Sequence, residues 1–226
     1  MTITKNGLKF NIAEISWGSL WESVEKGEWE PYTFDIMERF LTKDTCCLDV
    51  GAWMGPFAMY ASHLSRFCYA IEPDPVAYKG LVANIEANGL TNVQTFNEAI
   101  MNYDGVVVLG NENDYGNTIT RISQTAHQFQ TPCRTFQTFV RDNNIKDLGF
   151  IKVDVEGAEE VIFENLDFFQ DNRPVLYISL HPFWFKDEAK GRETIRKVGR
   201  MYKKCYDAYL NEADINVNHG IYVFAN

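Results

Sequence analysis

The 226-residue chain lacks any apolar run near the roughly 18 residues that a membrane-spanning helix needs. Its first residues, Met1–Lys5, lack the basic start and the apolar core of a secretion signal. We therefore expect a protein without a membrane span that works in the cytoplasm.

Paired cysteines and excess positive charge are missing as well. The five cysteines are odd in number and show no C-x-x-C spacing, so we interpret them as small core residues rather than zinc ligands or disulfides. The formal net charge is −10, whereas a protein that binds nucleic acid normally has a basic face that neutralises phosphates. The composition therefore predicts that nucleic acid is not the partner.

A third glycine is missing from the most informative turn of the chain. Residues Cys46–Gly55 run from an apolar strand into a helix with the pattern Asp-x-Gly-x-x-x-Gly, formed by Asp49, Gly51 and Gly55. A dinucleotide site uses G-x-G-x-x-G so that a pyrophosphate can lie at the helix N-terminus. Here Trp53 is not glycine, and Asp49 would repel a pyrophosphate. The pattern favours a cationic, phosphate-free cofactor, of which S-adenosylmethionine is the common one.

Polar residues follow several of the expected strands. Glu72 ends the apolar run Phe67–Ile71, and an acid at that position can accept hydrogen bonds from both ribose hydroxyls of a nucleotide. Asn97, Glu98 and Asp154 follow two later strands. Because the carboxyl ends of parallel strands meet at one edge of a sheet, we expect these residues to converge on a ligand site. Taken singly, each has an alternative as a helix cap, a turn residue or a solvated acid.

Strands and helices alternate along the chain, which predicts one α/β domain with a parallel sheet and helices on both faces. The expected strands are Cys46–Val50, Phe67–Ile71, Val93–Phe96, Phe150–Val155, Pro174–Leu180, Tyr206–Leu210 and Ile221–Phe224. The expected helices are Tyr32–Leu41, Pro56–Leu64, Pro75–Asn88, Phe136–Asp142 and Glu188–Tyr202. An added strand pair, Val106–Leu109 and Cys133–Thr135, flanks a polar segment, Gly110–Thr131, that we interpret as a loop over the site.

The segment Ile151–Glu159 alternates apolar and charged residues. A strand that is buried on both faces should not do this. We expect Lys152 to pair with a nearby acid, and Asp154 and Glu156 to face the cleft with Gly157 giving room behind them. The structural alternative is a solvated edge strand.

Together these motifs resemble the FkbM family of S-adenosylmethionine-dependent methyltransferases. The similar segments lie within residues 28–182 and are Trp29–Tyr32, Leu48–Gly55, Glu72–Pro73, Asn97–Ile100 and Ile151–Glu159. The resemblance implies a class I methyltransferase fold, a Rossmann-like doubly wound α/β sheet of about seven strands with an antiparallel last strand. It also implies O-methylation of a hydroxyl on a sugar, glycan or glycosylated metabolite.

By this resemblance, residues 29–226 form the catalytic domain, and we interpret residues 1–28 as an N-terminal extension that covers the acceptor site. The chain departs from the family pattern at Trp53–Met54, where the family has a small polar pair. The implied cofactor-binding residues are Glu30, Tyr32, Asp49, Gly51, Ala52, Gly55, Glu72, Asn97, Glu98 and Asp154.

The implied reaction is an in-line attack of the acceptor oxygen on the sulfonium methyl group. Positioning supplies most of the rate, and a base that removes the hydroxyl proton adds more. The candidates are Glu156, Asp154 and His181. A neutral imidazole suits pH 7, so the sequence narrowly favours His181 as the base and assigns Asp154 to the charged end of the cofactor. The same three residues would be the ligands of a magnesium or manganese ion, if one is used.

Two other functions remain open at this point. A nicotinamide-dependent oxidoreductase would share the fold and the ribose acid, but it would need the third glycine and would not need Asp49. A non-catalytic binding module with a vestigial cofactor cleft would bind the cofactor without turnover.

Overall fold

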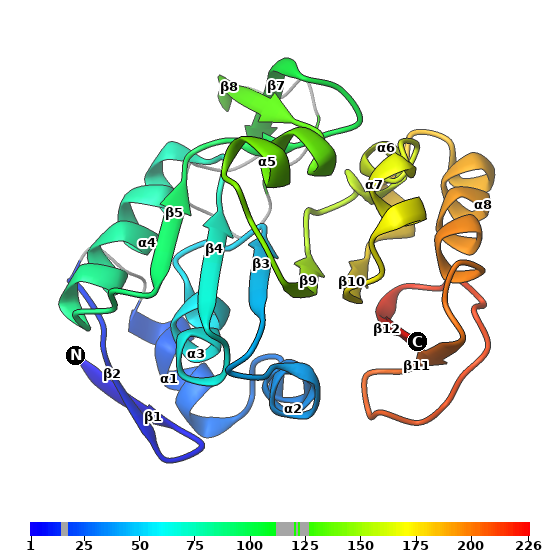
Figure 1. Cartoon of the computed structure of the whole chain (residues 1–226). Coiled ribbons are helices and arrows are strands. Elements are labelled where there is room, and N and C mark those ends of the chain that lie inside the picture. Colours follow the sequence, from blue (N-terminus) through cyan, green and yellow to red (C-terminus); the bar gives the residue numbers. More distant parts are fainter. Residues whose placement is uncertain (15–17, 112–119, 121, 123–126) are drawn as a thin grey trace.

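A seven-stranded sheet forms the centre of the molecule (Figure 1). The computed structural model describes residues 1–14, 18–111, 120, 122 and 127–226. The strand order is β11-β12-β10-β9-β3-β4-β5. The strands span Cys46–Val50 (β3), Phe67–Ile71 (β4), Val93–Phe96 (β5), Leu148–Val153 (β9), Val175–Leu180 (β10), Lys204–Tyr206 (β11) and Gly220–Ala225 (β12).

Five neighbouring strands of this sheet, from β10 to β5, are parallel. Strand β12 runs antiparallel between β10 and β11. This topology confirms the predicted doubly wound α/β fold and its antiparallel last strand. It also shows that the edge-strand alternative for the Lys152 segment is wrong, since β9 lies between β10 and β3.

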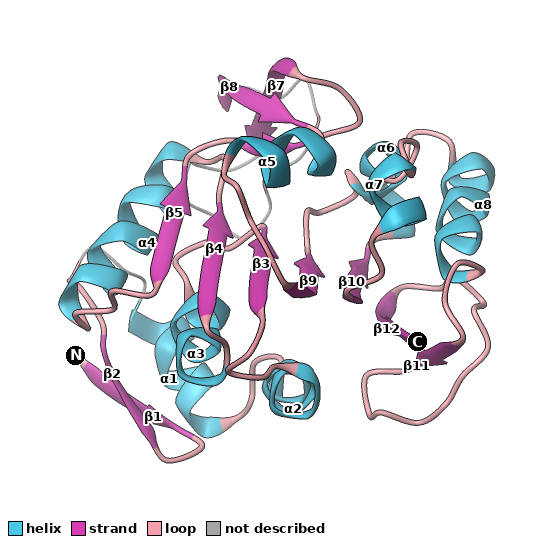
Figure 2. Ribbon diagram, in the orientation of Figure 1, coloured by secondary structure: helices cyan, strands magenta, loops and turns pink. Residues whose placement is uncertain are grey.

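Helices cover both faces of the sheet (Figure 2). Successive residues of β3 point to opposite sides: Cys47 packs in one core with α1 to α4, and Cys46 and Leu48 pack in a second core with α5 to α8. The helices are Gly18–Lys26 (α1), Pro31–Phe40 (α2), Pro56–Leu64 (α3), Pro75–Ala87 (α4), Phe136–Asp142 (α5), Glu159–Ile162 (α6), Asp167–Asp171 (α7) and Glu188–Gly199 (α8), with a 3₁₀ turn at Pro182–Trp184.

An N-terminal hairpin and a small second sheet complete the fold. The hairpin pairs β1 (Thr2–Lys5) with β2 (Leu8–Asn11). The second sheet consists of β6 (Ala99–Ile100), β7 (Gly105–Asn111) and β8 (His127–Arg134), and it lies above the ends of β4 and β5 in Figure 1. Strands β7 and β8 confirm the expected added pair. The expected loop Gly110–Thr131 is wrong at both ends, because Gly110 and Asn111 belong to β7 and His127–Thr131 belong to β8, where the two strands pair. Most of the remaining segment lies outside the described residues.

The expected bounds of β9 and β11 are wrong by two residues or more. Strand β9 stops at Val153 because the backbone turns at Glu156, which has a left-handed φ of 52°. The strand expected at 206–210 is instead Lys204–Tyr206, because Asp207 accepts hydrogen bonds from two backbone N–H groups of the following turn.

Two further features of the described residues concern the cysteines and the length of the helices. All five cysteines are buried and free, which confirms their interpretation as core residues. Among the described helices, none combines the length and the apolar character needed to cross a bilayer.

Candidate functional site

The glycine turn between β3 and α3 lies against the end of β9. Gly51 has a φ of +81°, and a Cβ atom there would lie 1.8 Å from the carbonyl oxygen of Asp154. Gly55 has a φ of +91°, and its Cβ would lie 2.6 Å from the side chain of Leu81. Both the backbone conformation and the close packing therefore require glycine at these positions.

Glu72 follows β4 and points back toward the glycine turn. Its Oε2 accepts a hydrogen bond from the backbone N–H of Trp53 at 2.8 Å, and its Oε1 accepts one from the N–H of Asp74 at 2.8 Å. Burial raises the pKa of Glu72 to about 8. Asp74 in turn caps α4 by accepting hydrogen bonds from Val76 and Ala77.

Two adjoining pockets open at the carboxyl ends of the strands. The first has a volume of about 590 Å³, and its wall includes Glu72 and Glu98. The second has a volume of about 520 Å³, and its wall includes Glu30, Ala52 and Lys152. The residues that line both pockets are Gly51, Trp53, Asp154 and Glu156. The two pockets thus share one wall, formed by the glycine turn and the loop after β9.

Several predicted cofactor residues lie away from the pocket walls, within the part of the chain that the structure describes. Asn97 donates hydrogen bonds to the carbonyl oxygens of Glu72 and Pro73, so it holds the loop that carries Glu72. Tyr32 packs edge-on against Tyr209, with the ring centroids 5.5 Å apart. Gly55 and Asp49 do not line either pocket, and neither does His181, which the sequence proposed as the base.

Asp49 belongs to a buried ion-pair group with Lys152. The two residues are register partners on β3 and β9, and Asp49 points to the α3 side of the sheet because it follows the alternation of the strand. The Lys152 Nζ lies 3.3 Å from Asp49 Oδ1 and 3.5 Å from Asp154 Oδ2. Burial disfavours the ammonium, but the charges of Asp49, Asp154 and Glu30 outweigh it and raise the pKa of Lys152. Asp49 thus pairs with Lys152 and is not among the residues that line the two pockets.

Lys152 is a site residue that the sequence reasoning did not assign to the site. It is 1% exposed overall, yet it contributes to the wall of the second pocket, and its Nζ lies 4.6 Å from the centroid of the Phe57 ring. The available signal was a charged residue in the middle of a strand that is otherwise apolar.

Three residues of the pocket walls hold left-handed backbone conformations without being glycine. Their φ angles are 39° for Glu30, 48° for Trp53 and 52° for Glu156. Such conformations cost energy and concentrate at functional sites. Burial, with the charge of Asp154 as a further contribution, raises the pKa of Glu30 to about 7. Burial is also the main reason that the pKa of Glu156 is raised to about 7.

His181 lies at the end of β10 between two carboxylates. Its Nδ1 is 3.0 Å from Glu159 Oε1, its Nε2 is 3.6 Å from Glu156 Oε2, and its ring stacks on Trp184. Burial disfavours the charged ring, but the hydrogen bond and charge of Glu159, with the charges of Glu156 and Asp154, raise the pKa of His181 to about 9. The imidazole is therefore charged at pH 7, unlike the neutral base that the sequence favoured.

The predicted group of Asp154, Glu156 and His181 does come together. One ligand atom from each residue lies within 4.8 Å of the others. Two carboxylate oxygens and an imidazole nitrogen could hold magnesium or manganese, but the same geometry also pairs a charged imidazole with carboxylates.

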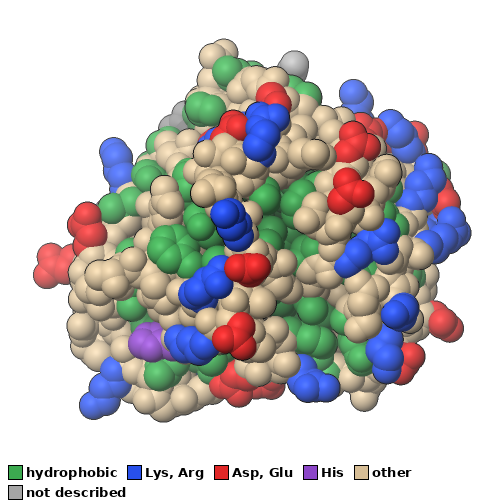
Figure 3. Space-filling model, in the orientation of Figure 1, with side chains coloured by type: hydrophobic (Ala, Val, Ile, Leu, Met, Phe, Trp, Pro, Cys, Tyr) green, Lys and Arg blue, Asp and Glu red, His purple; other side chains and the backbone are tan. Residues whose placement is uncertain are grey.

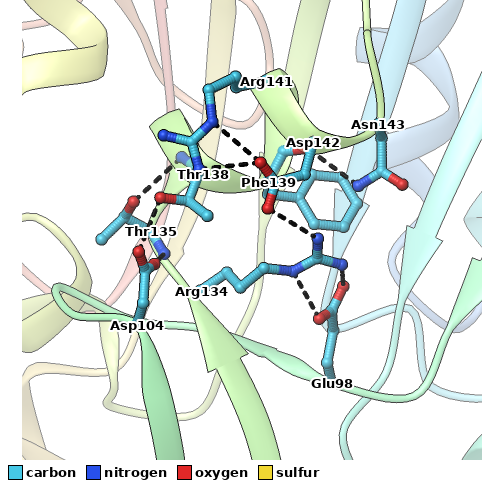
Figure 4. Close-up of polar contacts among 9 residues, drawn as sticks. All are labelled: Glu98, Asp104, Arg134, Thr135, Thr138, Phe139, Arg141, Asp142 and Asn143. Atoms are coloured by element: carbon cyan, nitrogen blue, oxygen red, sulfur yellow. Dashed lines mark hydrogen bonds and ion pairs between the residues drawn. The ribbon is translucent and has the colours of Figure 1, made fainter.

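Glu98, in the wall of the first pocket, forms an ion pair with Arg134 of the small sheet (Figure 4). Arg134 donates from Nε to Glu98 Oε2 at 2.8 Å, and a second nitrogen lies 2.5 Å from Oε1. Arg134 also lies 3.7 Å from Asp142 Oδ2 and over the ring of Phe139. Asp104 stabilises the same corner by accepting hydrogen bonds from Thr135 and Thr138 at the start of α5. The carboxylate of Glu98 is thus already engaged by a bidentate arginine.

The sheet order, the glycine turn and the acid after β4 define a class I methyltransferase fold. Residues 49–209 match the model of the Methyltransferase FkbM domain, and the chain belongs to this family. This confirms the family that the motifs resembled.

Comparisons with individual proteins agree with the family. Methyltransferase 1 of Beauveria bassiana (strain ARSEF 2860) is 24% identical over 147 residues, which are 55% of this chain and 59% of the relative. A tRNA (guanine(37)-N(1))-methyltransferase 1 of Phaeodactylum tricornutum (strain CCAP 1055/1) is 34% identical over 83 residues, 34% of this chain and 19% of the relative. The crystal structure of methyltransferase FkbM from Methylobacillus flagellatus KT shares the fold, with a TM-score of 0.50 at 14% identity over 80% of this chain and 43% of that one. This chain thus spans less than two thirds of the length of each of these relatives.

Proposed function

We propose that this protein is an S-adenosylmethionine-dependent O-methyltransferase that acts on a hydroxyl of a sugar, glycan or glycosylated metabolite. The observation that carries the proposal is the position of Glu156, a carboxylate with a pKa of about 7 in the wall shared by the two pockets. Membership of the FkbM methyltransferase family supports methyl transfer over the hydride transfer of an oxidoreductase.

The residues of the pockets fit S-adenosylmethionine. Glu72 provides a carboxyl group for the ribose hydroxyls. Gly51 lines both pockets, and its lack of a Cβ atom lets the end of β9 lie against the turn. Glu30 and Asp154 provide negative charge for the cationic end of the cofactor. When bound, the cofactor supplies an electrophilic methyl group.

Glu156 is the group that we assign as the general base. An alcohol is a poor nucleophile, so a base that takes its proton during the attack raises the rate. A carboxylate with a pKa of about 7 accepts a proton near neutral pH, and Glu156 faces both pockets. His181, charged at this pH, holds Glu156 from behind through Nε2. Glu159 fixes the ring of His181 through Nδ1.

Aromatic rings support a sugar as the acceptor class. Trp29, Trp53 and Phe57 line the second pocket. Trp53 and Phe57 are buried, whereas Trp29 is half-buried, and an accessible aromatic ring packs well against a sugar ring. We also propose that the N-terminal extension, residues 1–28, helps to cover this side, because Trp21 stacks on Trp53 with centroids 6.4 Å apart.

Charge supports an acceptor other than nucleic acid. The net charge is −10, and acidic and basic side chains are interspersed on the face shown in Figure 3. Because one of the relatives is a tRNA methyltransferase, the assay must also include RNA as an acceptor.

The direct test is to incubate the protein with methyl-labelled S-adenosylmethionine and a panel of glycans and glycosides, with tRNA and ribosomal RNA as separate reactions. We expect label to enter a glycan or glycoside. Transfer to RNA alone would contradict the proposed acceptor. Cofactor binding without transfer to any acceptor would instead support the binding-module alternative.

At pH 9, where Glu72 with its pKa of about 8 is ionised, Glu72→Ala should weaken S-adenosylmethionine binding by about 1–3 kcal/mol, because it removes charge-assisted hydrogen bonds to the ribose. Calorimetry on the folded variant measures the loss. Glu86→Ala, at an exposed position of α4, is the matched control and should bind normally. Unchanged affinity in a folded Glu72→Ala protein would refute the ribose assignment.

We expect turnover to survive EDTA, because the charged imidazole of His181 already pairs with the carboxylates of Glu156 and Glu159. Initial rates before and after chelation provide the measurement. A loss of rate that magnesium or manganese restores would show that Asp154, Glu156 and His181 hold a metal instead.

A further inference from the structure

Negative charge exceeds positive charge around the wall that the two pockets share. Lys152 lies between the carboxylates of Asp49 and Asp154, at 3.3 and 3.5 Å. On the other side, a single imidazole lies between two carboxylates in the same way, since His181 contacts Glu159 and Glu156. Each cation is thus shared by two carboxylates.

Glu30 adds a fifth carboxylate to this group. It lines the second pocket beside Lys152 and Asp154, and it accepts a hydrogen bond from the neutral hydroxyl of Thr33 at 3.3 Å. Within the described residues, its carboxylate forms no ion pair at 4.0 Å or less. The side chains of Asp154 and Glu156 are only 16% and 18% exposed, so water screens their charges weakly.

We propose that this excess of negative charge makes the pocket bind S-adenosylmethionine more tightly than S-adenosylhomocysteine. The inference rests on the proposed function, because it places the cationic end of the cofactor at the wall that the two pockets share. The two ligands differ by one methyl group and by the positive charge on sulfur, so uncompensated carboxylates favour only the first. The consequence is weak inhibition by the product of the reaction.

A third ligand, sinefungin, extends the comparison between S-adenosylmethionine and S-adenosylhomocysteine. Sinefungin has an amine, charged at neutral pH, where S-adenosylmethionine has its sulfonium. If charge rather than the methyl group is recognised, sinefungin should bind like the methyl donor and unlike the product. Because the ammonium of sinefungin also takes the place of the methyl group, the ligands alone do not separate charge from shape. A variant that removes a charge and keeps the shape of the side chain, Glu30→Gln, separates the two.

The test is calorimetry of the whole protein with the three ligands at pH 8, where Glu30 and Glu156, each with a pKa of about 7, are ionised. We expect S-adenosylmethionine and sinefungin to bind at least about 10-fold more tightly than S-adenosylhomocysteine. Glu30→Gln should reduce this ratio severalfold by weakening the two cationic ligands. Glu28→Gln, the same change at an exposed position two residues away, should leave the ratio unchanged.

The outcomes separate this inference from the proposed function. Equal or tighter binding of S-adenosylhomocysteine by the wild-type protein overturns the inference and leaves the methyltransferase assignment in place. Failure of all three ligands to bind overturns both. If Glu30→Gln does not fold, as judged by circular dichroism, Glu156→Gln tests the same ratio from the other side of the wall.

Discussion

Replacing Glu156 with glutamine should lower turnover by roughly 10²–10⁴, the range for a lost general base, while the affinity for S-adenosylhomocysteine changes little. The glutamine keeps the shape of the side chain, but it cannot take the proton of the acceptor hydroxyl. Steady-state rates and calorimetry on the same variant measure the two effects.

The pH profile of this variant gives an independent readout. In the wild-type protein, kcat/KM should rise as the pH passes through about 7, because Glu156 becomes a carboxylate. That rise should be lost in Glu156→Gln and retained in Glu86→Gln, a control on the exposed side of α4. Near-normal turnover in Glu156→Gln would remove the general base from the mechanism and leave positioning as the source of the rate.

Lys152→Met should lower the free energy of unfolding by about 3–5 kcal/mol, because removal of one partner leaves buried charge without compensation. Asp49, which is 2% exposed, would then lose the cation that lies 3.3 Å from its Oδ1. Denaturant unfolding of the variant and the wild type measures the difference.

The loss should depend on pH with a defined sign. Without Lys152, burial holds the folded-state pKa of Asp49 above its unfolded value, so the folded protein gains protons more readily. The destabilisation is therefore full at high pH and diminishes as the pH falls and the carboxyl group is protonated. The double variant Lys152→Met/Asp49→Asn should recover part of the loss at pH 8. An equal loss at pH 5 and pH 8 with no recovery would show that packing, not charge, explains the effect.

The central strands were predictable because each is a short apolar run that ends at a polar residue. The bounds of β3, β4 and β5 agree with the expected ones residue for residue. The helices α6 and α7 were missed because they have four and five residues, too few for a helical period to show in the sequence.

The site was predictable where a local rule fixes the conformation, as at Gly51 and Glu72. It was not predictable where the partner comes from another strand. The contact of Asp49 with Lys152 depends on the register of β3 and β9. The contact that charges His181 comes from Glu159, which lies 22 residues earlier in the chain. Sequence reasoning about an isolated histidine could not include this contact, which helps to raise the pKa of His181 to about 9.

The most direct test of methyl transfer to oxygen is to identify the methylated atom. After reaction with ¹³C-methyl S-adenosylmethionine and the best acceptor from the panel, the NMR spectrum of the product shows the atom that carries the new methyl group. We expect a methyl bonded to the oxygen of a sugar hydroxyl, and its yield should fall with Glu156→Gln. A methyl on nitrogen or carbon, or on a nucleobase, would contradict the account.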